Sequence, residues 1–132
     1  MAEAFKFELV SPERLLVSEE VESVVIPGVE GEMTVMVNHA PVMTTVKPGV
    51  VTVKTVEGAN ERYVVFGGFA DVLPTGCTLL AVSAVAVEDI DRADLAARIQ
   101  DAREDVADAK DDRARSSAEE TLQQLRALEE AI

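Results

Sequence analysis

Few of the residue types on which enzymes build active sites occur in this sequence. Its 132 residues include one cysteine, one histidine, one tyrosine and no tryptophan. The lone cysteine, Cys77, excludes an internal disulfide and is expected to be a small buried hydrophobe in a strand. No nucleophile motif surrounds Cys77 or His39, and little aromatic surface is present on which a base or a sugar could stack. The composition therefore argues against nucleophilic catalysis and against carbohydrate or RNA binding.

A basic excess and long apolar runs are also missing. Twenty-five acidic side chains against 12 basic ones give a net charge of −13, which excludes nucleic acid as a partner and direct insertion into anionic lipid. No run approaches the roughly 18 apolar residues of a membrane-spanning helix. The first ten residues lack the basic and apolar regions of a signal peptide. We expect a soluble protein that is cytosolic or held at a membrane only through its partners.

Residues 5–87 have the pattern of antiparallel β-structure. They contain all seven glycines and all five prolines, and apolar and polar residues alternate through their valine-rich and threonine-rich runs. Tight turns are predicted at Pro27–Gly28, Lys47–Gly49 and Pro74–Gly76. A bulge or tight bend between strands is predicted at Gly67–Gly68. Short strands at this spacing predict an all-β sandwich or flattened barrel.

From Glu88 the composition changes abruptly to alanine, acidic residues and arginine, which predicts two domains, residues 1–87 and 88–132. Asp89 is the expected cap of a first helix, and Ser116–Glu120 offers a capping box for a second. We predict a helical hairpin, with one continuous helix as the alternative, because no glycine or proline separates the two helices. Two apolar stripes define their buried faces: Leu95, Ile99, Ala102, Val106 and Ala109, then Ala118, Leu122, Leu125, Leu128 and Ile132.

The segment Ile26–Val50 combines several predicted turns with the only histidine. Pro41 restricts the backbone of Ala40, so the loop is expected to present His39 rigidly. With no nucleophile or second base in view, an interface or turn-stabilising role for His39 is favoured over general-base catalysis.

Three runs of this sequence resemble a known family: VSPERLL (Val10–Leu16), IPGVEGEMTVMVNHAPVMTTVKPGVV (Ile26–Val51) and FGGFADV (Phe66–Val72). Together with the acidic two-helix tail, they closely resemble the epsilon subunits of bacterial F-type ATP synthases over essentially the whole chain. The resemblance implies a β-sandwich of about ten antiparallel strands followed by a C-terminal α-helical hairpin. It also implies a subunit with no catalytic activity and no cofactor of its own.

The resemblance further implies partners and a location. Members bind the gamma subunit in the central stalk and the polar loops of the c-ring, so that proton flow is coupled to ATP synthesis. Such a rotor subunit is peripheral to the bacterial inner membrane, at its cytoplasmic face. By position in the matching motifs, Glu32 is expected to face the c-ring, and Ser11, His39 and Thr44 are expected to face gamma.

In the family, the C-terminal helices can extend toward the alpha and beta catalytic subunits and restrain ATP hydrolysis, and in some members they bind ATP. The nucleotide motif is Ile or Leu, Asp, two variable residues, Arg and Ala. Here Ile90 and Asp91 match, but Asp94 and Leu95 replace the last two residues. Because an anion in place of the cation repels a triphosphate, ATP binding is predicted to be weak or absent. The extended helices of the family meet an acidic segment of the catalytic subunit. Residues 110–132 hold six acidic residues against four basic ones, so charge complementarity is poor and weak restraint of ATP hydrolysis is predicted.

Two other functions stay open from the sequence. The first is a nucleotide-sensing regulatory module that uses Ile90, Asp91, Arg98 and Arg126. The second is a small ligand-binding β-sandwich with a dimerising helical tail.

Overall fold

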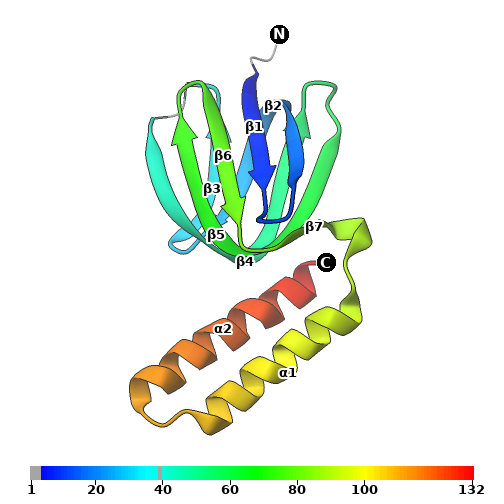
Figure 1. The fold of residues 1–132 in the computed structure, drawn as a ribbon. Coiled ribbons are helices and arrows are strands. Elements are labelled where there is room, and N and C mark those ends of the chain that lie inside the picture. The colour runs from blue at the N-terminus through cyan, green and yellow to red at the C-terminus, as the bar shows by residue number, and fades with distance from the viewer. Residues whose placement is uncertain (1–3, 39) are drawn as a thin grey trace. The chain divides into compact units, whose positions relative to one another are not determined.

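The computed structural model describes residues 4–38 and 40–132, and Figure 1 shows strands followed by two helices. The chain falls into two compact units, Met1–Glu88 and Asp89–Ile132.

The first unit is a sheet that closes on itself. Its strand order is β1-β6-β5-β4-β2-β3, and β7 pairs with β5. Because β1 pairs in parallel with β6 and antiparallel with β2, the path returns to its start as a flattened barrel. The predicted β-sandwich class is confirmed. The described strands are β1 (Phe5–Val10), β2 (Leu15–Gly28), β3 (Gly31–Met36), β4 (Val42–Thr55), β5 (Asn60–Leu73), β6 (Gly76–Ala81) and β7 (Ala84–Ala86).

Alternate side chains of these strands fill the interior. Burying one valine or leucine contributes about 1.5–3 kcal/mol, so a set of this size dominates the stability of the unit. Cys77 is 3% exposed within this core, which confirms its predicted role as a buried hydrophobe. The core consists of Phe5, Phe7, Leu9, Val17, Val21, Val24, Ile26, Val35, Val46, Val51, Val53, Val65, Ala70, Val72, Cys77, Leu79 and Ala81.

Three strands are longer than the turn residues predicted. About ten strands were expected for a sandwich of this kind, but the described residues form seven, because β2, β4 and β5 each run for 14 residues. The reversal predicted at Lys47–Gly49 is wrong: Pro48 and Gly49 pair with Phe66 and Val65 inside the β4–β5 ladder. In Figure 1, β4 and β5 curve strongly along their length.

Gly67 and Gly68 form a bend, but within β5 and not between two strands. Their φ angles are 99° and 145°, a backbone region that residues other than glycine rarely adopt. A Cβ on Gly68 would overlap the carbonyl oxygen of Leu80 in β6. The missing Cβ at Gly68 therefore lets β5 approach β6, its neighbour in the same sheet.

The second unit contains α1 (Arg92–Asp108) and α2 (Asp112–Ala131). Asp91 caps α1, since its Oδ1 accepts hydrogen bonds from the N–H groups of Ala93 at 2.9 Å and Asp94 at 3.2 Å. The prediction that Asp89 caps this helix is wrong, because Asp89 ends a short 3₁₀ turn, η1 (Val87–Asp89).

The second helix begins earlier than predicted. Asp111 caps α2 through a hydrogen bond of 2.7 Å from the N–H of Ala114. The capping box predicted in Ser116–Glu120 is wrong, because good helix formers precede it and extend the helix back to the first aspartate that can cap it.

The two helices form the predicted hairpin. The extended backbone of Ala109, with ψ 131°, ends α1 and excludes one continuous helix in this structure. Arg98 and Asp94, one turn apart on α1, form an ion pair at 3.1 Å. No helix in the described ranges is long and apolar enough to cross a membrane. The buried residues of the two helices are Leu95, Ile99, Ala102, Leu125 and Leu128.

Replacing Gly68 with alanine is expected to destabilise the protein by about 2–4 kcal/mol, because the new Cβ meets backbone and the φ angle is strained. The matched control is Gly58→Ala. Gly58 also has a positive φ, 86°, but open space around it. The control is expected to cost about 1–2 kcal/mol from strain alone. Urea unfolding of the three proteins measures both values, and equal losses would contradict a specific contact between β5 and β6.

Candidate functional site

A row of outward-facing residues crosses four strands of the barrel. Val10 of β1 pairs with Leu80 of β6, Leu80 pairs with Phe69 of β5, and Phe69 pairs with Thr45 of β4. Phe69 and Leu80 are each 53% exposed. Their sequence neighbours Ala70 and Leu79 are fully buried, which turns this row outward.

The row forms part of an apolar groove with a volume of about 520 Å³. Val82, 68% exposed, extends the groove beyond the end of β6. Contiguous exposed apolar surface of this kind marks sites of protein interaction. We call this set the apolar groove: Val10, Ser11, Pro12, Thr45, Gly68, Phe69, Leu80, Ala81 and Val82.

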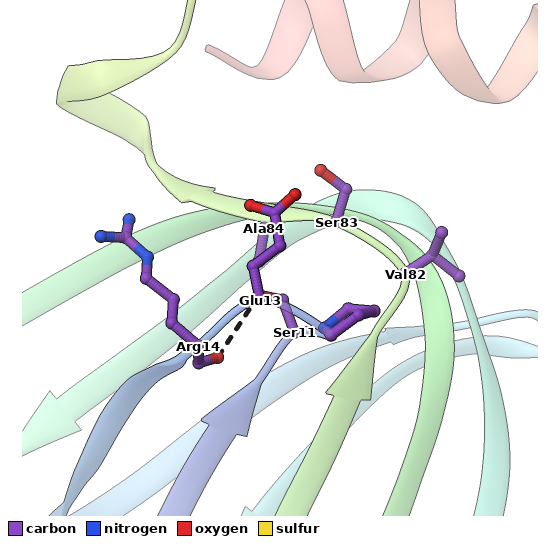
Figure 2. A pocket seen from close by; sticks show the side chains of 7 residues that line it. Ser11, Glu13, Arg14, Val82, Ser83 and Ala84 are labelled. Carbon is purple, nitrogen blue, oxygen red and sulfur yellow. Dashed lines mark hydrogen bonds between the residues drawn. The ribbon is translucent and has the colours of Figure 1, made fainter.

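Ser11 lies where the apolar groove meets a second, polar pocket of about 340 Å³. Figure 2 shows Ser11, Glu13 and Arg14 in this pocket together with Val82, Ser83 and Ala84. The turn between β1 and β2 is held by reciprocal backbone hydrogen bonds between Ser11 and Arg14, at 2.9 and 3.2 Å. The Ser11 hydroxyl also donates to the Arg14 carbonyl at 3.3 Å. Ser11 is thus fixed at the edge of the groove.

Thr44 lies on the opposite face of β4 from the groove. It pairs with the buried Ala70, and its hydroxyl donates to the carbonyl oxygen of Thr45 at 3.4 Å. The same carbonyl accepts the N–H of Val29 at 3.0 Å. Thr45, and not Thr44, lines the groove.

Glu32 is exposed on β3, where it pairs with Pro27 next to the β2–β3 turn. At the tip of this turn Val29 is 48% exposed. Glu32 does not line the apolar groove, although the Val29 N–H at this turn donates to the carbonyl oxygen of Thr45, which does. His39 lies outside the described residues, and its expected role at an interface stays a prediction.

The chemistry of the described residues fits binding better than catalysis. Burial, with a contribution from the Asp71 carboxylate, raises the pKa of the Cys77 thiol to about 12, so the nucleophilic thiolate does not form at neutral pH. Within residues 4–38 and 40–132, no group of three or more His, Cys, Asp or Glu side chains is arranged to hold a metal ion.

The four residues of the suggested nucleotide site lie on three segments of the second unit. Ile90 and Asp91 precede α1, Arg98 is on α1, and Arg126 is exposed on α2. The Asp91 carboxylate already accepts two backbone N–H groups, and Arg98 pairs with Asp94. None of the four lines any of the three pockets found in the described part of the chain.

Of the residues that line the apolar groove, the sequence singled out Ser11 as an interface residue. It did not single out Thr45, Phe69, Leu80 and Val82. The available signal was alternation: in Phe69–Leu73 and Thr78–Ala81 one apolar face is buried, so Phe69 and Leu80 stand on the other face. The short turn between β5 and β6 sets the register that brings these two side chains opposite each other. Their meeting with Val10 of β1 depends on a pairing between strands far apart in the chain, which no local pattern specifies.

A closed β-sandwich with an apolar docking groove, joined to a two-helix unit, is the class of protein that these features define. Residues 4–87 match the model of the ATP synthase Delta/Epsilon chain β-sandwich domain. The ATP synthase epsilon chain of Mesorhizobium japonicum is 80% identical over 132 residues, with 100% of this chain and 98% of the relative covered. That of Chelativorans sp. is 62% identical over the same coverage. The chain belongs to the ATP synthase epsilon-chain family, as its sequence indicated.

Solved structures agree. A chain in the cryo-EM structure of the Euglena gracilis mitochondrial ATP synthase, comprising OSCP, F1 and c-ring, has a TM-score of 0.77 and 29% identity. The match covers 97% of this chain and 81% of that one. A central stalk and c-ring structure from Tetrahymena thermophila gives a TM-score of 0.64 with 96% of each chain covered. At 12% identity, the second match supports the fold alone.

ATP is expected to bind the full chain weakly or not at all, because Asp91 is engaged as a helix cap and Asp94 places an anion where the family motif has arginine. Calorimetric titration tests this, and a micromolar dissociation constant would contradict it. Asp94→Arg, which restores the cation, is the matched variant and is expected to bind ATP more tightly than the unmodified chain.

Proposed function

We propose that this chain is a non-catalytic rotor subunit in the central stalk of a proton-translocating F-type ATP synthase. It binds the gamma subunit through the apolar groove and the c-ring near Glu32, and so couples proton flow to ATP synthesis. Membership of the epsilon-chain family supports this role, as does a 29% identical neighbour in a structure that comprises F1 and the c-ring. Residues 1–87 would form the coupling domain and residues 88–132 the regulatory domain.

The observation that carries the proposal is the exposed apolar row of the groove. Phe69, Leu80 and Val82 each leave at least half of their surface in solvent, at 53%, 53% and 68%. Apolar surface removed from water contributes about 25 cal/mol per Å², so a partner that covers this row gains affinity without any charge pairing. An aromatic side chain near the centre of such a patch is a typical hot spot.

The proposed gamma contacts combine this groove with the residues suggested by the resemblance. Ser11 lines the groove directly. Thr44 supports it from the inner face, through its bond to the Thr45 carbonyl. His39 is retained in the set on the resemblance alone.

The proposed c-ring contact is the β2–β3 hairpin. Glu32 and the neighbouring Glu30 are both exposed there. Carboxylates of this kind accept charge-assisted hydrogen bonds from basic side chains and hydrogen bonds from backbone N–H groups, which suits a polar loop as partner.

The helical unit is proposed to restrain ATP hydrolysis only weakly, through the alpha and beta catalytic subunits. It holds seven basic and fourteen acidic side chains in residues 88–132, so it complements an acidic partner poorly. Bound through gamma and the c-ring, the protein would lie peripherally at the cytoplasmic face of the inner membrane.

Replacing Phe69 with serine is expected to weaken binding to gamma by about thirtyfold, as for loss of a hot-spot aromatic side chain worth about 2 kcal/mol. Val56→Ser is the matched control, because Val56 is 49% exposed but lies outside the groove. Interferometry with immobilised gamma measures the affinities, and circular dichroism verifies the fold. Equal affinities for the two variants would remove the groove from the interface.

A cysteine at position 32 is expected to crosslink to cysteines in the polar loops of the c-ring within the assembled enzyme. The native Cys77 is 3% exposed and should not compete. Cysteine at Glu13, exposed at the β1–β2 turn, serves as the control. Crosslinking from position 13 but not from position 32 would place a different edge of the barrel against the c-ring.

A further inference from the structure

Two glutamates occupy inward-facing strand positions where aliphatic side chains are otherwise found. Glu19 of β2 lies opposite Phe7 of β1, which is fully buried. The next residues on the same face of β2 are Val17 and Val21, both in the core. Side chains alternate along a strand, and paired residues of adjacent strands share a face. The Glu19 carboxyl therefore points toward the interior.

Glu61 also occupies an inward-facing position, on β5. It pairs with Val53 of β4, which is fully buried, and Tyr63, two residues later, packs against the core. Both glutamates are half-buried. β2 and β5 are not paired with each other in the described ladders. The Glu19 and Glu61 carboxyl groups nevertheless lie within hydrogen-bonding reach of each other, at the end of the barrel next to the β4–β5 turn.

Each carboxyl group has one buried oxygen, Oε1 of Glu19 and Oε1 of Glu61, that accepts no hydrogen bond from any residue that the structure describes. Thr55, buried at this end of β4, does not supply one. Its hydroxyl donates to the Ala59 carbonyl at 3.4 Å and accepts the Ala59 N–H at 3.1 Å. Ionised carboxylates only accept hydrogen bonds, so two that face each other are satisfied when one of them keeps its proton.

The charges that act on Glu19 and on the neighbouring Tyr63 come from acidic groups, and Arg62 also lines the pocket beside Glu61. A hydrogen bond with Glu61, burial, and the charges of Glu61 and Glu57 raise the pKa of Glu19 to about 7. Burial and the carboxylates of Glu61, Glu19 and Glu88 raise the pKa of the Tyr63 hydroxyl. These groups come from β2, the β4–β5 turn, β5 and η1, and each of them disfavours a second negative charge at this end of the barrel.

We infer that Glu19 and Glu61 share one proton near neutral pH and so form a proton-dependent clasp between β2 and the β4–β5 hairpin. The protonated carboxyl of one donates its O–H to an oxygen of the other. A pocket of about 450 Å³ beside Glu61 gives the proton a route to solvent. Loss of the proton leaves two facing carboxylates, whose repulsion loosens this end of the barrel.

The direction of the pH dependence follows from the raised pKa. The pKa of Glu19 is about 7 in the fold against an ordinary value of 4.5, so the folded chain holds the proton more tightly than the unfolded chain. The stabilisation is complete below about pH 4.5 and is lost as the pH rises through about 7. The melting temperature is therefore expected to be lower at pH of about 8.5 than at about 6.

The test is a pH titration of the full chain, labelled with ¹³C at the glutamate carboxyl groups and followed by NMR. The Glu19 carboxyl is expected to take up a proton with a midpoint near 7. In Glu61→Gln the Glu19 midpoint should fall toward the ordinary range. Glu20→Gln, at the exposed neighbouring position on β2, is the control and should leave it unchanged.

Either of two NMR results would overturn the clasp. One is titration of the Glu19 carboxyl of the unmodified chain near 4.5, which requires no variant to fold. The other is a shift of both carboxyl signals on addition of sodium or calcium ions at neutral pH, which would make the pair a cation site. A melting temperature of Glu19→Gln that falls with pH as steeply as that of the unmodified chain would also contradict it.

Discussion

The pairing of β1 with two strands is the constraint on which the first unit depends. By joining β6 on one edge and β2 on the other, β1 closes the sheet and removes two exposed strand edges. It also inserts Phe5, Phe7 and Leu9 into the core. Closure fixes which face of every strand points inward, and therefore which residues are left for partners.

The apolar groove and the glutamate pair are the two consequences of this closure. Outward positions of β1, β6, β5 and β4 bring Val10, Leu80, Phe69 and Thr45 into one row, because the three ladders that join these strands are in register. Inward positions at the far end of the core bring Glu19 to Glu61 across the interior. We propose the groove as the surface that binds a partner subunit, and the interior glutamate pair as the feature that ties the stability of the barrel to pH.

The helical unit is stabilised in a different way from the barrel. Its interior is thin, and its ends are fixed by single aspartates, Asp91 and Asp111, that accept backbone N–H groups. A unit with few buried side chains is readily remodelled at low energetic cost. This suits a regulatory element, whereas the closed barrel suits a part that must transmit force without yielding.

The sequence by itself determined the class of fold, the change from strands to helices, the buried Cys77 and the family, because alternation, helical spacing and motif order are local properties. It misjudged the lengths of β4 and β5, since Pro48 and Gly67–Gly68 lie inside strands that their ladders keep continuous. It also misplaced both helix caps, which are Asp91 and Asp111. Only the tertiary structure decided that Val10 meets Leu80 and that Glu19 meets Glu61. Both contacts join strands distant in sequence, and their register is set by packing of the whole core.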